Sequence, residues 1–251
     1  MNPHEGVEDS TDLIDELSFP SIGRATPELI YETLRAQILS AEKEPGSTLA
    51  QSIVARSYGV SRGPVREAFR MLQREGLIES ETNFRATVTP LSIEEVEHLY
   101  AMRIVNECMA LSVSIPQLSP SELDELDALV VRLNRMQVLE IAEWETCHQR
   151  FHGLLFAHVS DRTRSELAHW AEHTERYRRV YIQGGATGWA LGATEHAQIA
   201  LACRNSDAAA GTRILAQHLA RAGLTLVAIM DPSHKPDLLR AALNQVTIES
   251  R

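Results

Sequence analysis

The segment 59–78 constrains the fold more strongly than any other part of this sequence, because it joins a turn to the start of an amphipathic helix. Gly59 can adopt the left-handed backbone that a tight turn requires, and Ser61 is a favourable N-cap residue. Pro64 falls in the first helical turn, where its missing N–H costs nothing. Because Pro64 cannot donate, we expect the Ser61 hydroxyl to cap the amide of Gly63. The pattern is typical of the second half of a helix-turn-helix.

One face of this helix carries an arginine at every fourth position: Arg62, Arg66, Arg70 and Arg74. At about 100° per residue these arginines cover an arc of about 120°, and Val65, Phe69 and Leu72 lie on the other side of the helix. Such a helix can bury its apolar face while its guanidinium groups face a DNA groove, where arginine reads guanine and neutralises phosphate. The alternative is an ordinary surface helix with solvated arginines.

Charge is distributed unevenly along this chain of 251 residues, whose formal net charge is −10. Residues 1–21 contain six acidic residues and no lysine or arginine, which predicts an acidic, flexible arm over 1–24. Residues 52–74 contain five arginines against one acid, Glu67. Despite the acidic balance of the whole chain, this basic patch is the surface that DNA would meet.

The composition also indicates a cellular compartment. No apolar run is long enough to cross a membrane, and the acidic N-terminus lacks the features of a secretion signal. The cysteines are odd in number, widely spaced and without a CxxC pair, which favours reduced, buried thiols: Cys108, Cys147 and Cys203. We therefore expect a cytoplasmic protein with no membrane partner.

The arginine helix is predicted to belong to a small domain over 25–90. Apolar spacing predicts a helix over 27–41, the pair Pro45-Gly46 breaks the chain, and a short helix follows over about 50–57. Gly76 ends the arginine helix. Two short strands, at 77–78 and 86–88 around a turn at 82–83, would then form a wing. The sequence therefore predicts a winged helix-turn-helix DNA-binding domain.

From Ser92 onward the periodicity is helical and no strand alternation is found. Capping boxes at Ser92 with Glu95 and at Ser119 with Glu122 predict two helix starts. The predicted helices cover 92–114, 119–138, 140–159, 162–182, 190–204 and 206–230. We expect a mainly α protein, in which an all-α bundle over 91–231 follows the winged domain and 232–251 forms a weakly specified C-terminal tail.

Four histidines fall within the apolar stripes of three predicted helices: His148, His152, His196 and His218. An i, i+4 pair can bind one metal ion from one helix, and bundles build such sites from facing helices. His169 and His173 have the same spacing but lie beside charged residues, which favours a position at the surface or rim. The alternative for each buried histidine is a hydrogen-bonded core residue.

In the order of its parts the chain resembles a transcriptional regulator of the GntR family, FadR subgroup, over about residues 25–230. The resemblance rests on Pro45-Gly46 with Leu49, on the run from Gly59 to Ala68 and on the run from Glu75 to Ile78. It implies a winged helix-turn-helix followed by an FCD-type effector-binding helical domain. The residues that it implies for DNA binding, with the basic residues beside them, are Ser61, Arg62, Gly63, Arg66, Arg70 and Arg85.

Within this set the resemblance gives Arg62 and Arg66 the base-reading role and brings the backbone of Gly63 close to phosphate. Two positions depart from the family pattern. Ser52 stands where the family often has arginine, and Arg85 stands where its wing usually has glycine. The operator sequence can therefore not be taken from relatives.

For the bundle, the resemblance implies a metal motif of Asp-x-x-x-His and two later histidines. Here His152, His196 and His218 match the histidines, and His148 stands where aspartate is usual. Exchange of an oxygen ligand for imidazole favours zinc, or nickel or copper, among the divalent transition metals, over manganese. It also leaves the charge of the metal uncompensated, which would strengthen its attraction for an anionic effector.

An effector site is implied beside the metal. Arg103 matches a family position that commonly faces the effector cavity, where a guanidinium can clamp a carboxylate. Tyr177 and Arg178 are further candidates for effector binding. The alternative for Arg103 is a plain helix-surface arginine.

The expected function is that of a ligand-responsive regulator rather than an enzyme. It would bind a pseudo-palindromic double-stranded DNA operator as a homodimer, with half-sites about 34 Å apart, and a small organic acid would release repression. One alternative is a metal-free regulator that binds an acyl-type ligand. Another is a metal-dependent hydrolase, which is disfavoured because no carboxylate lies in the apolar stripes beside His148, His196 or His218 to serve as general base.

Overall fold

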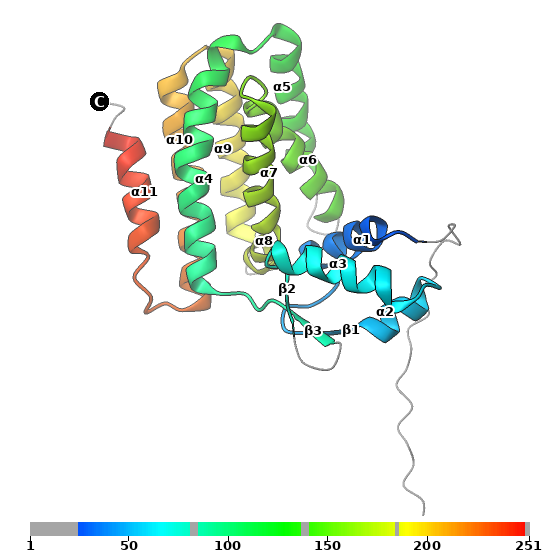
Figure 1. Ribbon diagram of the computed structural model, residues 1–251. Coiled ribbons are helices and arrows are strands. Elements are labelled where there is room, and N and C mark those ends of the chain that lie inside the picture. Colours follow the sequence, from blue (N-terminus) through cyan, green and yellow to red (C-terminus); the bar gives the residue numbers. More distant parts are fainter. Residues whose placement is uncertain (1–24, 81–84, 137–140, 184–185, 249–251) are drawn as a thin grey trace, which may run out of the picture.

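The computed structural model describes residues 25–80, 85–136, 141–183 and 186–248, and these form two units (Figure 1). The first unit contains three helices and a small sheet, and the second is a bundle of helices. The expected fold class, a mainly α chain with a winged helix-turn-helix before an all-α bundle, is confirmed. The acidic arm at 1–24 and the wing turn at 82–83 lie outside the described residues.

The first unit begins with a helix capped by the Thr26 hydroxyl. Its elements are α1 (Pro27–Leu39), β1 (Thr48–Ala50), α2 (Gln51–Ser57), α3 (Arg62–Arg74), β2 (Ile78–Ser80) and β3 (Arg85–Val88). The strands form an antiparallel sheet in the order β1-β3-β2, with Leu49 opposite Ala86 and Glu79 opposite Thr87. Strand β1 was not predicted, because three residues are too few to show an alternation and the strand depends on its pairing with β3.

Helices α1 and α3 provide half of the buried core residues of this unit. Ile30, Leu34 and Ile38 of α1 are buried with Val65 and Leu72 of α3. The predicted turn before α3 is present, with a positive φ of 62° at Gly59 and of 77° at Gly76 after the helix. Glycine adopts this left-handed backbone without the steric cost that a Cβ brings.

The start of α3 differs from the prediction in one respect. Ser61 is the N-cap residue of this helix, but its side chain makes no capping hydrogen bond. A serine at this position normally bonds the amide of the second or third helical residue, and the third is Pro64, which has none. The hydroxyl does not turn to the remaining amide, that of Gly63, so the expected cap is absent.

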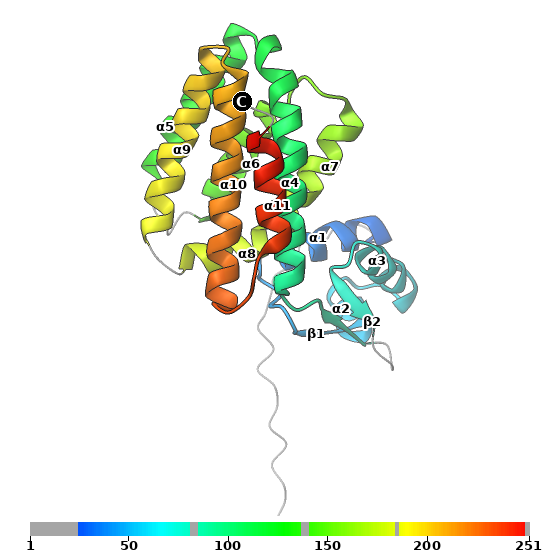
Figure 2. The same ribbon diagram turned by 90° about the vertical axis from the view of Figure 1, so that its left-hand side faces the viewer.

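The bundle is built around α4, a long central helix. Its elements are α4 (Ile93–Ser114), a 3₁₀ turn (Ile115–Gln117), α5 (Pro120–Arg135), α6 (Ile141–Leu155), α7 (Asp161–His173), α8 (Glu175–Gln183), α9 (Ala186–Arg204), α10 (Ala208–Met230) and α11 (Asp237–Ile248). Helix α4 packs on α10 and α11, and Figure 2 shows the three side by side. Ser92 caps α4, and Ser119 with Glu122 forms the predicted capping box at α5.

Two parts of the bundle differ from the sequence prediction. The helix predicted over 162–182 is divided at Thr174, which lies between α7 and α8. The segment predicted as a tail contains α11, which packs on α4 and α10. Glu97 of α4 holds the start of α11, because its carboxylate accepts the backbone N–H of Leu238 at 2.6 Å and of Leu239 at 3.2 Å.

Gly223 lies where α10 packs closely against α4 and α11. A Cβ at this position would lie 2.6 Å from Cδ1 of Leu239 in α11 and 2.9 Å from Cγ of Tyr100 in α4. We therefore expect Gly223→Ala to lower the free energy of unfolding by about 1–3 kcal/mol, because the added methyl group overpacks the contact. Urea denaturation followed by circular dichroism measures this change.

Gly153→Ala is the matched control, since Gly153 also lies within a helix and a Cβ there would have nothing within 4 Å. We expect this control to be neutral or to stabilise by up to about 1 kcal/mol, the ordinary helix preference for alanine. Equal unfolding free energies for the two variants would contradict the tight packing of α10.

Candidate metal centre and nucleic-acid interface

Helix α3 has the two faces that its sequence predicts. Its apolar face is buried, and it consists of Val65, Ala68, Phe69 and Leu72. Its other face is exposed and carries the four arginines Arg62, Arg66, Arg70 and Arg74. The guanidinium group of Arg70 lies 3.0 Å from the carboxylate of Glu67, and both side chains are about half exposed. Salt bridges this exposed contribute little, so Glu67 does not fix Arg70 in place.

The other candidates for DNA contact surround this face. Ser61 and Gly63 are exposed at the start of α3, and Arg85 is exposed at the start of β3. A helix start presents backbone N–H groups and the positive end of the helix dipole, both of which attract phosphate. The first unit thus combines an exposed cationic helix with a positive helix start.

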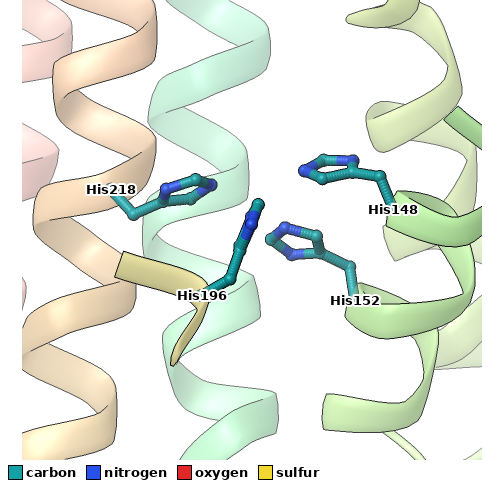
Figure 3. A group of neighbouring side chains, drawn as sticks. All are labelled: His148, His152, His196 and His218. Atoms are coloured by element: carbon teal, nitrogen blue, oxygen red, sulfur yellow. The ribbon is translucent and has the colours of Figure 1, made fainter. Parts of the chain in front are cut away.

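The four predicted histidines come together inside the bundle (Figure 3). His148 and His152 extend from α6, His196 from α9 and His218 from α10, and all four are buried. One nitrogen of each ring lies within 4.8 Å of the corresponding nitrogens of the other three. The rings point toward one another, as four ligands of a common ion would.

The hydrogen bonding of these rings tests whether a metal ion would fit. Both ring nitrogens of His152 and Nε2 of His196 are buried without a hydrogen-bond partner. Buried polar atoms in native proteins nearly always have a partner, so such atoms need an explanation. A metal ion held by one nitrogen of each imidazole would satisfy Nε2 of His196 and one of the two nitrogens of His152, and tetrahedral nitrogen coordination is common for zinc. The residues present fit the ion.

Neighbouring groups orient two of the rings. Nδ1 of His218 lies 2.7 Å from Oε2 of Glu195, which can only accept, so Nδ1 carries the proton and Nε2 keeps its lone pair. The ring of His148 stacks on Trp144, with 4.5 Å between ring centroids. These contacts hold the imidazoles in the orientation that ligation requires.

Burial keeps all four imidazoles neutral near pH 7. Burial and the neighbouring rings place the pKa of His148 and of His196 well below the ordinary value. Burial lowers the pKa of His152 to about 4, against the opposing effect of Glu107, and it also lowers the pKa of His218, against Glu195. Neutral imidazole is the form that ligates a metal ion.

Two carboxylates lie beside the histidines, and the expectation that the stripes of the histidine helices contain no carboxylate is wrong for α6, where Glu145 is buried. Glu107 of α4 approaches His152 with 3.6 Å between Oε2 and Nδ1, and Glu195 contacts His218. The prediction that the charge of a metal would be uncompensated is therefore wrong in part. Each carboxylate also pairs with a guanidinium group, Glu107 with Arg103 and Glu195 with Arg221. These pairs neutralise part of the negative charge that would otherwise compensate the metal ion.

A cavity of about 190 Å³ opens between α6 and α7 beside the histidines. Its walls include His148 and His152 together with Arg103 and Arg178, two of the three predicted effector contacts. The third, Tyr177, is not among the lining residues. Its hydroxyl instead donates to Oε2 of Glu95 at 2.6 Å and accepts the amide of Ser92 at 3.3 Å, so it fastens α8 to the start of α4.

Arg103 and Arg178 are held by a buried network at one end of this cavity. The Nε of Arg103 donates to Glu107 at 2.5 Å, and Arg178 donates through Nε and Nη2 to Glu145 at 3.1 and 2.7 Å. The hydroxyl of Thr174 accepts from both arginines, at 2.9 and 2.6 Å. Arg103 is therefore a fixed charge of the cavity wall, and not the helix-surface residue of the alternative interpretation.

The second histidine pair is placed differently from its prediction. His169 is partly exposed, as expected for a rim, but His173 is buried and lies against Glu75 of the first unit. The distance from its Nε2 to Oε1 of Glu75 is 3.0 Å. A position at the junction of two units cannot be recognised from the charged neighbours of one helix.

Sequence reasoning missed four residues of the site, namely Glu107, Glu145, Thr174 and Glu195. Glu107 was detectable, since it follows Arg103 by four residues on the same helix and such pairs interact. Glu145 and Glu195 gave no such signal, because their partners come from other helices. Thr174 lies four residues before its partner Arg178, but it was expected inside a continuous helix. Among the described residues, no helix is long and apolar enough to cross a membrane.

Comparison with known proteins identifies both units. Residues 26–88 match the family model described as bacterial regulatory proteins, gntR family, and residues 98–221 match that of the FCD domain. The solved structure of McbR/YncC from Escherichia coli covers 82% of this chain and 99% of its own, with 17% identity and a TM-score of 0.71. At this identity the likeness shows the shared fold.

Two relatives are similar in sequence. Over 165 residues, 62% of this chain and 67% of the relative, the chain is 32% identical to the uncharacterized HTH-type transcriptional regulator BphR of Paraburkholderia xenovorans (strain LB400). It is also 30% identical to the uncharacterized HTH-type transcriptional regulator YdhC of Bacillus subtilis (strain 168). This match covers 132 residues, which are 51% of this chain and 59% of that relative. The second match thus spans about three fifths of the relative. The chain belongs to the GntR family of bacterial regulatory proteins, as a DNA-binding transcriptional regulator with an FCD domain and not as an enzyme.

Proposed function

We propose that this protein is a homodimeric repressor whose hold on its operator is released by a small organic acid that binds beside a metal ion in the FCD domain. The observation that carries the proposal is the convergence of four buried histidines, with unpartnered ring nitrogens, on the wall of a cavity. The same chain carries the exposed arginine face of α3. Because it acts on DNA, we expect it to work in the cytoplasm.

For DNA recognition, α3 would enter the major groove with Arg62 and Arg66 reading base edges. Ser61, Gly63 and Arg70 would contact the backbone, where charge neutralisation supplies affinity without sequence information. Arg85 would add a cation from the wing. The strong burial of the opposite face fixes the rotation of α3, so the arginines cannot turn away from the groove.

For ligand recognition, His148, His152, His196 and His218 would hold the metal, with zinc preferred and nickel or copper possible for an all-imidazole set. When bound, the metal supplies a cationic anchor for an oxygen of the effector. Arg103 and Arg178 are already bonded to Glu107, Glu145 and Thr174, so they contribute fixed positive charge near the acid rather than a flexible clamp.

A metal-free regulator that binds an acyl-type ligand is the second candidate. The observation that favours it is the apolar part of the cavity wall, which includes Phe156, Leu167 and Ala171. The hydrolase alternative is not supported, because the family is one of DNA-binding regulators. Glu107 is also a poor general base: burial raises its pKa, but Arg103 and His152 outweigh this and lower it to about 2.

The proposed dimer has a surface on which to form. Val105, Met109 and Val113 follow one another at four-residue spacing on α4, and each is exposed. Apolar residues at this spacing form a continuous stripe on one face of a helix. Since a pseudo-palindromic operator requires two recognition helices, we assign this stripe to the contact between two copies of the chain.

The first prediction of this proposal concerns DNA. Arg66→Ala should weaken binding to an operator selected from random duplex DNA by about 1–3 kcal/mol, because one base-edge contact is lost. Fluorescence anisotropy measures the affinity. Arg162→Ala, which removes another exposed arginine, from α7, should leave the operator affinity unchanged. Equal losses for the two variants would show that Arg66 contributes only charge.

The second prediction concerns the metal. The purified protein should contain about one equivalent of a transition metal per chain by mass spectrometry, and His196→Ala should lose most of it. His98→Ala, which removes an exposed histidine from α4, should retain the metal. Less than about a tenth of an equivalent in the native protein would overturn the metal site. Binding of organic acids that survives a chelator would then favour the metal-free candidate.

The third prediction concerns assembly. Met109→Glu should convert the dimer to a monomer in sedimentation velocity experiments, because it places a charge within the apolar stripe of α4. Leu201→Glu is the control, since Leu201 is similarly exposed, at 59% against 55% for Met109, but lies on α9. A Met109→Glu variant that remains dimeric would place the dimer contact elsewhere.

A further inference from the structure

Helix α7 touches both the cavity and the DNA-binding unit. Leu167, Ala171 and Glu172 of this helix line the cavity beside the histidines. Near the end of the same helix, Oε2 of Glu172 accepts a hydrogen bond from Nη2 of Arg35 in α1 at 2.6 Å. One side chain therefore belongs to the wall of the ligand cavity and to the contact between the two units.

Arg35 also contacts Glu75, the residue at the end of helix α3. Its Nε lies 2.8 Å from Oε1 of Glu75, the residue that caps the C-terminal end of α3. Tyr31 donates to Oε2 of Glu75 at 2.8 Å, and His173 of α7 lies 3.0 Å from Oε1. Glu75 is thus held by α1 of its own unit and by α7 of the bundle.

The charged groups of this cluster hold the two units together, because they are ionised and largely buried. Burial would raise the pKa of Glu75, but hydrogen bonds from His173, Arg35 and Tyr31 lower it to about 2, so the carboxylate is ionised. Only 8% of its side chain is exposed, which reduces screening by solvent. Removal of one partner would leave a buried charge incompletely paired, and this costs more than loss of a surface ion pair.

The cluster also contains a second group that could in principle hold a metal ion, formed by Glu75, His169 and His173. However, Oε1 of Glu75 already accepts a hydrogen bond from Nε of Arg35, and it lies 2.7 Å from Nη2 of Arg35 and 3.0 Å from Nε2 of His173. A metal ion would have to displace the guanidinium group and would lie beside its charge. The contacts therefore favour a cluster of ion pairs that joins the two units over a second metal centre.

We propose that Glu172 is the positioning residue through which occupancy of the cavity reaches the recognition helix, by its hold on Arg35 and, through Arg35, on Glu75. A ligand that fills the cavity moves or repels the Glu172 carboxylate. Arg35 then loses one of its two acidic partners, and the end of α3 keeps the contact between Glu75 and His173 to hold it to α7. The inference rests on the proposed function, because it assigns a regulatory role to the same cavity.

The test uses a side chain of the protein in place of the unidentified ligand. Gly153 lines the cavity, and a Cβ there would have nothing within 4 Å, so Gly153→Phe fills the cavity from its own wall. Operator affinity is measured by fluorescence anisotropy for this variant, for Glu172→Gln and for the double variant. Glu166→Gln, an exposed carboxylate of the same helix, replaces Glu172→Gln in the control cycle.

We expect Gly153→Phe to change operator affinity by about fivefold or more, the range of ordinary allosteric coupling. In the Glu172→Gln background the change should fall below about twofold, whereas in the Glu166→Gln background it should be retained. Hydrogen exchange provides a second readout: filling the cavity should speed amide exchange at residues 72–77 only when Glu172 is present. If thermal denaturation shows that Gly153→Phe does not fold, Gly153→Leu replaces it.

An equal change of affinity in both backgrounds, or none when the cavity is filled, would overturn the role of Glu172. These outcomes differ from a failure of the proposed function. In that case the unmodified protein itself would bind selected operators no better than random DNA, and Arg66→Ala would have no effect.

Discussion

The burial of two arginines within the bundle is the constraint on which the rest of the site depends. Arg103 and Arg178 have almost no contact with water, and a guanidinium group in such surroundings must be paired. Glu107 and Glu145 supply the charges, and Thr174 accepts a hydrogen bond from each arginine. Thr174 lies at the break between α7 and α8, and the preceding residue, His173, contacts Glu75 of the DNA-binding unit. Arg103, Arg178, Glu107 and Glu145 together form a charged layer beside the histidines. Glu107 connects this layer to them, because its carboxylate lies 3.6 Å from Nδ1 of His152.

The sequence predicts best where a residue's role follows from its own helix. The arginine face of α3 and the inward direction of His148, His152, His196 and His218 follow from helical phase, and the structure shows both. The partners Glu195 and Glu145 were not predictable, because they meet their counterparts across two helices. Helix α11 was missed for a related reason, since its start is held by Glu97, which is distant in sequence. Tyr177 shows the opposite error: its place next to Arg178 in the sequence did not bring it to the cavity.

The histidine cluster and the charged layer have opposite requirements that the fold satisfies together. Four neutral imidazoles need a dry environment, because burial keeps them unprotonated, whereas Arg103 and Arg178 need full compensation in the same environment. Separate partners achieve this: Glu107 and Glu145 bind the guanidinium groups directly, and among the described residues Glu195 is the one carboxylate with a short hydrogen bond to one of the four clustered imidazoles. As a result the ring nitrogens that face one another are left for an ion, and no side chain of the charged layer takes that position.

The missing cap at the start of α3 has a consequence for the energetics of DNA binding. The first backbone N–H groups of a helix have no partner within the helix, and Ser61 satisfies none of them. This end of the helix is exposed, so water can reach these groups in the free protein. A phosphate group seated there would complete the hydrogen bonding of the helix while it neutralises the dipole. Contact with the backbone would thus stabilise the reading helix itself, and folding of its first turn would be thermodynamically linked to binding.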